Sequence, residues 1–256
     1  MTIGRVHARR WPAVEAARLV VLVHGYGEHI GRYEQMAQAL AARGSAVVGP
    51  DHVGHGRSSG ERALVEDFEP VVDDLRAVVQ ATRDDLPIVM VGHSMGGLIA
   101  TRYAQRHRED LAGLVLSAPA VGLGPVVEGW LDAPELSPDP LDVAALSRDP
   151  AAREAYAADP LVWHGGWKRA TLEAFVAADR AIAQGPGFGD LPLLYVHGGD
   201  DQLVPVELAR PVIERVAGPD SELHVVEGAR HEVFFELGKE QTIDSVASFA
   251  ERVTAR

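Results

Sequence analysis

A single serine lies between glycines in the stretch Gly92-His93-Ser94-Met95-Gly96. The apolar run before it, Leu86–Val91, is typical of a buried strand, and the segment after it, Leu98–His107, contains helix-forming residues and no breaker. We therefore expect Ser94 on a sharp strand-to-helix turn, where a serine hydroxyl is held in position to act as a nucleophile. The alternative is that Ser94 only caps the helix that follows.

A serine hydroxyl needs a base before it can attack a substrate. Two later strand ends offer candidates, because Leu193–Val196 leads into Asp200 and Asp201, and Leu223–Val226 leads into His231. On a parallel sheet the partners of such a serine follow it in the order acid, then histidine. The residues alone leave both aspartates open as the acid, and a plain surface position remains the alternative for His231.

Attack on an acyl carbon creates an oxyanion, which requires backbone N–H donors. Met95 follows the serine directly and is expected to supply one donor. The second donor is expected from the loop after an early strand, in the stretch Val23-His24-Gly25-Tyr26-Gly27. We expect it to be the N–H of Tyr26, whose alternative role is to close a glycine turn.

The same glycine-rich loop resembles part of a dinucleotide-binding motif. Gly25 and Gly27 follow a strand, and Asp51 ends the next strand. The third glycine of that motif is missing, because Ile30 stands in its place. A nicotinamide enzyme is therefore the weaker interpretation, and we predict no cofactor.

Two other groups of polar residues are expected to be structural. His52 and His55 lie close in the sequence, but no third ligand is suggested by the spacing, so we predict no metal site. Glu28 and Arg32 are four residues apart and can pair at the start of a helix, where they would support the fold.

The elements that must position these residues alternate regularly along the chain. Short apolar runs without polar alternation indicate strands covered on both faces, as in parallel sheets; they are Leu19–Val23, Ala46–Val48, Ile88–Val91, Leu114–Leu116, Leu193–Val196 and Leu223–Val226. Helical patterns lie between them, at Arg32–Arg43, Pro70–Arg83, Gly97–His107, Pro205–Ala217 and Lys239–Arg256. This order predicts an α/β fold with a mostly parallel central sheet and helices on both faces.

One region interrupts the alternation. Residues 121–186 contain no strand candidate, although Asp142–Ala157 and Lys168–Ala183 have helical patterns. We predict that 121–186 form a helical lid (cap) subdomain, and that residues 1–120 and 187–256 form the core. The stretch Val126-Val127-x-x-Trp130-Leu131 places apolar residues at helical spacing in this lid, and Trp163 and Trp167 also lie four residues apart.

Composition narrows the classes of partner and location. The 256 residues are 46% hydrophobic and carry a formal net charge of −13, which argues against a nucleic-acid-binding surface. The absence of cysteine excludes disulfides and thiol nucleophiles and fits a reducing compartment. No apolar run approaches the roughly 18 residues needed to span a bilayer, and none near the N-terminus suits a signal peptide. A cytoplasmic protein is expected.

Seven stretches of the chain resemble monoacylglycerol lipases of the α/β-hydrolase superfamily. They are HGYGEHIGRYE (24–34), DHVGHGRSSGER (51–62), GHSMGGLIA (92–100), LSAPAV (116–121), LSRDP (146–150), YAADPL (156–161) and EGARHE (227–232). The resemblance implies a triad of Ser94, Asp201 and His231, with Tyr26 and Met95 forming the oxyanion hole. The family spacing from the glycine at 198 favours Asp201 over Asp200.

The chain also departs from the family. The residues before Leu19 suffice for one edge strand, Ile3–Trp11, so we predict a sheet of seven strands that lacks the family's first strand. The lid is shorter before Leu146 than in animal members, which leaves the acyl chain length open.

The resemblance implies hydrolysis of monoacylglycerol to a fatty acid and glycerol through an acyl-enzyme. A general carboxylesterase or a lysophospholipase on the same fold is the alternative, and a non-catalytic ligand-binding protein is a weaker one. The expected partner is a small lipid ester, and the lid is expected to touch lipid surfaces transiently.

Overall fold

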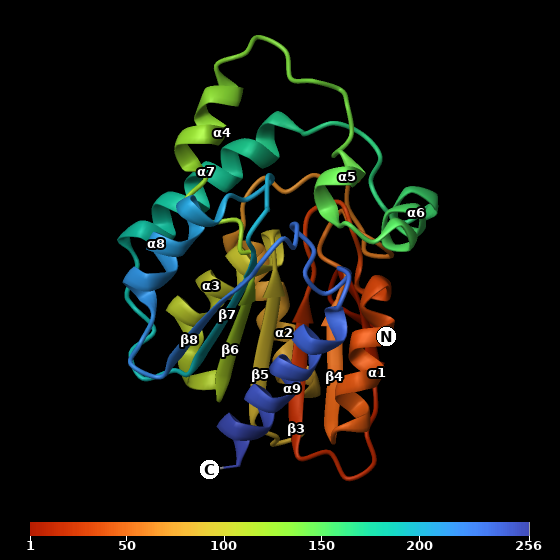
Figure 1. The fold of residues 1–256 in the computed structure, drawn as a ribbon, viewed down its shortest axis with the longest axis vertical. Helices are drawn as coiled ribbons and strands as arrows, with labels where there is room; N and C mark the ends of the chain where they lie inside the picture. Colours follow the sequence, from red (N-terminus) through yellow and green to blue (C-terminus); the bar gives the residue numbers. More distant parts are fainter. Residues whose placement is uncertain (256) are drawn as a thin grey trace.

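The computed structural model describes residues 1–255, in which eight strands form one sheet. The strands are β1 (Thr2–Ile3), β2 (Val6–Trp11), β3 (Arg18–Val23), β4 (Ser45–Pro50), β5 (Ile88–His93), β6 (Gly113–Ser117), β7 (Leu193–Gly198) and β8 (Ser221–Val226). Their order across the sheet is β1-β2-β4-β3-β5-β6-β7-β8. The pairs β1–β2 and β2–β4 are antiparallel, and every later pair is parallel. The carboxyl ends of the parallel strands therefore share one edge, at the upper end of the sheet in Figure 1.

Helices cover both faces of this sheet (Figure 1). They are α1 (Glu34–Ala42), α2 (Glu69–Thr82), α3 (Met95–His107), α4 (Gly124–Leu131), α5 (Val143–Leu146), α6 (Pro150–Ala158), α7 (Arg169–Gln184), α8 (Val206–Val216) and α9 (Lys239–Thr254), with short 3-10 helices at Ile30–Tyr33 and Arg108–Asp110. The sequence pattern predicted a last helix through Arg256; that residue lies outside the described part of the chain.

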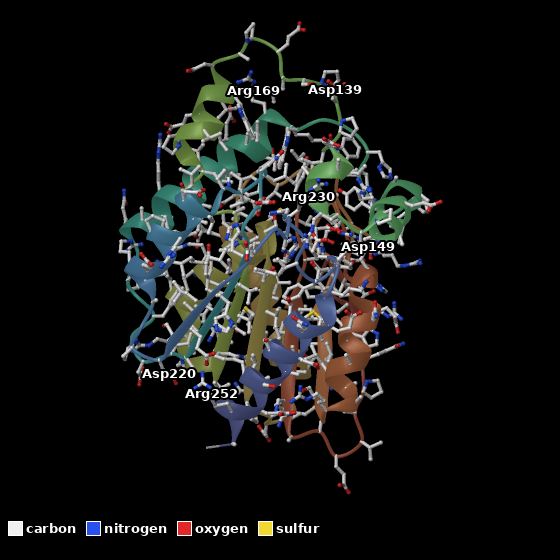
Figure 2. All side chains as sticks on the ribbon, viewed as in Figure 1. Asp139, Asp149, Arg169, Asp220, Arg230 and Arg252 are labelled. Atoms are coloured by element: carbon white, nitrogen blue, oxygen red, sulfur yellow. The ribbon has the colours of Figure 1, made fainter. Side chains whose placement is uncertain are left out.

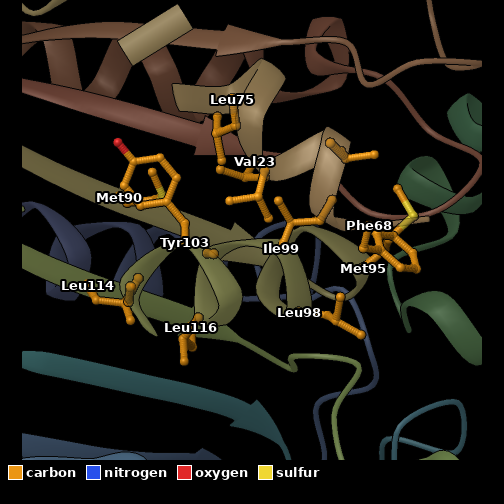
Figure 3. Close-up of a cluster of buried hydrophobic side chains, with 14 of the residues drawn as sticks. Val23, Phe68, Leu75, Met90, Met95, Leu98, Ile99, Tyr103, Leu114 and Leu116 are labelled. Atoms are coloured by element: carbon orange, nitrogen blue, oxygen red, sulfur yellow. The ribbon is translucent and has the colours of Figure 1, made fainter. Parts of the chain in front are cut away.

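The apolar strands are buried on both sides, because successive side chains of a strand point to opposite faces. Leu19, Val21 and Val23 of β3 pack with the core that includes α2 and α3, whereas Val20 and Leu22 pack with the core that includes α1 and α9. Figure 3 shows the first of these cores, where Val23 lies near Leu75, Ile99 and Tyr103. Burial of each Val or Leu side chain contributes about 1.5–3 kcal/mol to the stability of the fold. The central strands therefore stabilise the sheet.

The predicted absence of the first strand was wrong. Thr2 and Ile3 form β1 and pair with His7 and Val6 of β2. Gly4 adopts a positive φ of 56° in the turn, which lets the chain reverse within two residues. A hairpin therefore fits into a segment that seemed long enough for only one strand.

Two further expectations need correction. The edge strand β8 is not covered on both faces, because three of its six residues are exposed, including Val225 at 45%. The helical pattern 142–157 is divided into α5 and α6. Asp149 caps the start of α6, because its side chain accepts a hydrogen bond from the backbone N–H of Ala151. Pro150 follows in the first turn of α6, where a backbone N–H would have no helical carbonyl to bind.

The helices α4 to α7 lie above the carboxyl ends of the strands (Figure 1). In this layer α4 packs on α7 through Val127, Leu172 and Val176. Arg230, from the loop after β8, lies beneath α5 (Figure 2) and donates hydrogen bonds to the carbonyl oxygens of Ala144 and Ser147. The treatment of 121–186 as a separate lid subdomain stays a prediction.

Among residues 1–255, no helix combines the length and the apolar character that crossing a bilayer would require.

Candidate active site

Ser94 lies on the turn between β5 and α3, in an unusual backbone conformation. Its φ is 54° and its ψ is −120°, a region that costs a non-glycine residue free energy unless the surroundings hold it. Two close approaches make glycine necessary beside it. A Cβ on Gly96 would lie 2.0 Å from the carbonyl oxygen of Val23, and one on Gly92 would lie 2.5 Å from the carbonyl oxygen of Gly96. The glycines therefore allow the turn to pack against the neighbouring strand ends.

Asp201 and His231 meet in a buried ion-pair geometry. Asp201 follows β7 and His231 follows β8, and the Nδ1 atom of His231 lies 2.7 Å from Oδ2 of Asp201. Both residues are buried. Burial disfavours the charged form of His231, but the Asp201 carboxylate outweighs it and raises the pKa of the histidine above its ordinary value. Burial likewise disfavours the charged form of Asp201, yet His231 and hydrogen bonds hold the pKa of Asp201 well below its usual range.

The two adjacent aspartates have different surroundings. Asp200 is exposed to solvent, and its backbone N–H donates to the carbonyl oxygen of Ala229. The carboxylate of Asp201 is fully buried, and its Oδ1 atom accepts hydrogen bonds from the backbone N–H groups of Leu203 and Val204, each at 2.9 Å. Only the second aspartate of the doublet thus reaches His231.

The two predicted oxyanion donors belong to segments that lie next to Ser94. Met95 is the first residue of α3, where the helix leaves its leading N–H groups without helical partners. Tyr26 lies in the loop after β3, which approaches the serine closely, because a Cβ on Gly25 would lie 3.2 Å from Cβ of Ser94. The ring of Tyr26 stacks on Trp167 with centroids 4.1 Å apart. Trp163 and Trp167 lie in the segment before α7 and not on a helix.

A cavity of about 80 Å³ opens onto Ser94 and His231. Its walls are mainly apolar and come largely from α4, α7 and nearby loops, including Leu123, Val127, Trp130, Leu146, Trp167, Leu172, Phe175 and Leu203. Polar side chains also line it, among them Glu28, His93, Tyr156 and Glu232. The cavity thus offers an apolar wall and a polar part next to the same serine.

Glu28 and Glu232, which line the polar part of the cavity, belong to an ionic cluster that the sequence indicated only in part. The side chain of Arg32 is only 7% exposed, and it contacts Glu28 at 2.5 Å and Glu232 at 2.6 Å. Its guanidinium also lies over the rings of Tyr156 and Phe235. The pairing of Glu28 with Arg32 was expected from their spacing. Glu232 was missed as a partner, although its position directly after His231 was a usable signal.

Three histidines cluster behind the loop that carries Tyr26. The ring of His24 lies 4.3 Å from that of His52 and 5.6 Å from that of His55, measured between centroids. Burial lowers the pKa of His52 to about 3 and that of His55 to about 4, so both are neutral near pH 7. Within residues 1–255, no three His, Cys, Asp or Glu side chains are arranged to hold a metal ion.

Comparisons with known proteins identify the family of this chain. The family model described as serine aminopeptidase, S33, matches residues 14–238. A monoacylglycerol lipase of Mycolicibacterium smegmatis is 40% identical over 251 residues, covering 93% of this chain and 89% of the relative. The monoglyceride lipase of Homo sapiens is 34% identical over 247 residues, covering 90% and 80% respectively.

A solved structure gives the same result for the fold. The crystal structure of the Paleococcus ferrophilus monoacylglycerol lipase matches with a TM-score of 0.81 at 28% identity, covering 98% of both chains. The predicted α/β-hydrolase fold is confirmed, apart from the corrected strand count. The chain therefore belongs to the monoacylglycerol lipase family of serine hydrolases.

Proposed function

We propose that the protein hydrolyses monoacylglycerols, with Ser94, Asp201 and His231 as the catalytic triad. The observation that carries the proposal is the buried Asp201–His231 pair, whose histidine lines the same largely apolar cavity as Ser94. The family relatives named monoacylglycerol or monoglyceride lipase support the substrate class. Residues 121–186 act in this proposal as the lid that encloses the acyl chain.

The reaction follows from the tautomer that Asp201 imposes. Because Nδ1 of His231 faces the carboxylate, its Nε2 atom is left to take the proton of Ser94. The serine oxygen then bonds to the acyl carbon, and the oxyanion accepts hydrogen bonds from the N–H groups of Tyr26 and Met95. The raised pKa of His231 lets it hold this proton. Glycerol leaves with the proton, and a water molecule repeats the sequence to release the fatty acid.

The polar part of the cavity favours a neutral alcohol over a phosphate. Glu28 and Glu232 carry two negative charges against one positive charge on Arg32, all three side chains being nearly fully buried. This excess of negative charge repels an anionic leaving group, because screening is weak away from water. Carboxylate oxygens and the hydroxyl of Tyr156 can exchange hydrogen bonds with glycerol hydroxyls. We therefore place lysophospholipids behind monoacylglycerols as substrates.

We further propose that α4 brings the lid to a lipid surface. Val126 and Trp130 are 40% and 44% exposed, while Val127 between them is buried against α7. An exposed apolar stripe of this kind can enter the boundary of a neutral lipid surface without basic residues. That suits a chain with a net charge of −13.

The test is the specificity constant, kcat/KM, for monoolein, diolein and triolein in matched micelles, with 1-oleoyl lysophosphatidate as the anionic comparison. We expect the order monoolein, diolein, triolein, with lysophosphatidate well below monoolein. Ser94→Ala serves as the blank. Equal or greater efficiency on triolein would contradict the proposed substrate class. A strong preference for acetate esters would indicate a short-chain esterase instead.

A further inference from the structure

Asp201 has a second histidine partner besides His231. The Nε2 atom of His197 lies 3.1 Å from Oδ2 of Asp201, the same oxygen that His231 contacts. Oδ1 of Asp201 is held by the backbone N–H groups of Leu203 and Val204. The carboxylate therefore has contacts with four potential donors, and both of its oxygens are engaged.

The surroundings of His197 fix which nitrogen carries its proton. Nε2 faces two acceptors, because it also lies 2.7 Å from the carbonyl oxygen of Val204. A nitrogen between two acceptors must carry the hydrogen. Nδ1 lies 2.5 Å from the hydroxyl of Tyr195. In the neutral ring Nδ1 is an acceptor, so Tyr195 donates to it, and the one hydrogen on Nε2 is shared between the carbonyl oxygen of Val204 and Oδ2 of Asp201.

The strand β7 places this chain of hydrogen bonds. Tyr195 and His197 are two residues apart on β7, so their side chains lie on the same side of the strand. Asp201 follows the end of that strand, and all three side chains are buried. Neither Tyr195 nor His197 lines the cavity at Ser94. Any effect of His197 on the reaction must therefore pass through another residue.

We propose that His197 is a positioning residue that acts through Asp201, with Tyr195 fixing its tautomer. The inference rests on the proposed triad. His197 holds Oδ2 so that its remaining lone pair faces Nδ1 of His231, and its donor hydrogen bond favours the ionised carboxylate. The proton taken from Ser94 then stays on His231 instead of passing to Asp201. A histidine that only fills the core would pack equally well without controlling that carboxylate.

Two amide substitutions of His197 separate the positioning role from a purely structural one, because each amide reaches the place of a different ring nitrogen. His197→Gln carries its amide N–H to about the place of Nε2 and keeps the donor to Asp201, whereas His197→Asn reaches only about the place of Nδ1 and loses it. We expect His197→Asn to lower kcat by about 10- to 100-fold with KM unchanged, and His197→Gln to stay within about threefold of wild type. Thermal unfolding of both variants monitors folding.

A double-mutant cycle tests the route through Asp201. In an Asp201→Asn background, His197→Asn should cost no more than about twofold further in kcat. A full additional loss there, or equal damage from the two amide variants, would overturn the proposal. If His197→Asn does not fold, Tyr195→Phe provides the test: it should lower kcat by about three- to tenfold, and add nothing in the His197→Gln background.

The same experiments keep this inference separate from the proposed function. If Asp201→Asn keeps full esterase activity, the triad itself is wrong. If Asp201→Asn is crippled while His197→Asn keeps wild-type kcat, the triad stands and only the role of His197 fails.

Discussion

The floor and the roof of the cavity at Ser94 are built in opposite ways. In the floor, Ser94, Asp201 and His231 lie in the segments that follow β5, β7 and β8, and each oxygen of Asp201 has two contacts. In the roof, α4 and α7 share a small apolar cluster, and α4 exposes two large apolar residues. From this difference we infer a division of roles, in which the floor carries out the proposed chemistry and the roof controls access of the substrate. Floor variants should then change kcat, and roof variants should change KM.

The largest effect is expected at the nucleophile of the floor. Ser94→Ala should lower kcat by about 10⁶-fold, as in other serine hydrolases that lose the attacking oxygen. A fluorophosphonate probe should modify the wild-type peptide that contains Ser94, and excess ester should protect it. Labelling of another serine would remove Ser94 from the mechanism.

The aspartate doublet offers a matched pair within the floor. Asp201→Asn should lower kcat by about 10⁴-fold, because the amide no longer stabilises the charged form of His231. Asp200→Asn changes the same chemical group one residue earlier, on an exposed side chain, and should stay within about tenfold of wild type. The reverse ranking would contradict the assignment of the acid.

The pH profile of activity tests whether the Asp201 carboxylate raises the pKa of His231. His231 must be neutral to accept a proton, and its folded pKa is raised above the ordinary value of 6.5. Activity should therefore be lost as the pH falls through a value above 6.5, measured as kcat/KM on a soluble ester. In Asp201→Asn the raising carboxylate is gone while burial remains, so the residual activity should extend to lower pH. An unshifted profile in this variant would show that Asp201 does not set the pKa of His231.

The smallest effect is expected in the roof. Val126→Glu places a charge on the exposed face of α4 and should raise the apparent KM for monoolein in phosphatidylcholine vesicles by about three- to tenfold, because a charge is costly at a lipid boundary. Turnover of a soluble short-chain ester should be unchanged. Val14→Glu is the matched control, since Val14 is 92% exposed and lies in the loop before β3. Equal effects of both substitutions would argue against docking through α4.

The sequence was most informative where one interaction dominates. Unbroken apolar runs predicted the central strands, because burial on both faces leaves no room for polar alternation. The turn at Ser94 could be located because only glycine fits beside it. The edges were predicted less well: β1 depends on the turn at Gly4, and β8 carries apolar residues although one face is open. The pattern of apolar residues along a strand does not show whether that strand lies at the edge of the sheet and is exposed to solvent.

The contacts around the site were predictable only in part, for a related reason. Asp201 and His231 could be named because they follow strand ends. His197 gave no comparable signal, since its position within an apolar strand is also that of an ordinary core histidine. Its contact with Asp201 depends on the path of the loop that brings Val204 back toward β7. Likewise, the contact of Arg32 with Glu232 joins residues 200 positions apart.

The arrangement of the strands also sets the order in which the site is completed during synthesis. The ribosome makes the turn of Ser94 early, whereas Asp201 and His231 follow β7 and β8 near the carboxyl terminus. If Ser94, Asp201 and His231 form the proposed triad, an unfinished chain holds the attacking oxygen without its base and is expected not to cleave esters. The same holds for any fragment that ends before residue 231. Premature termination or proteolytic removal of the last quarter of the chain is therefore expected to yield inert products, because the proposed acid and base follow β7 and β8, the last two strands.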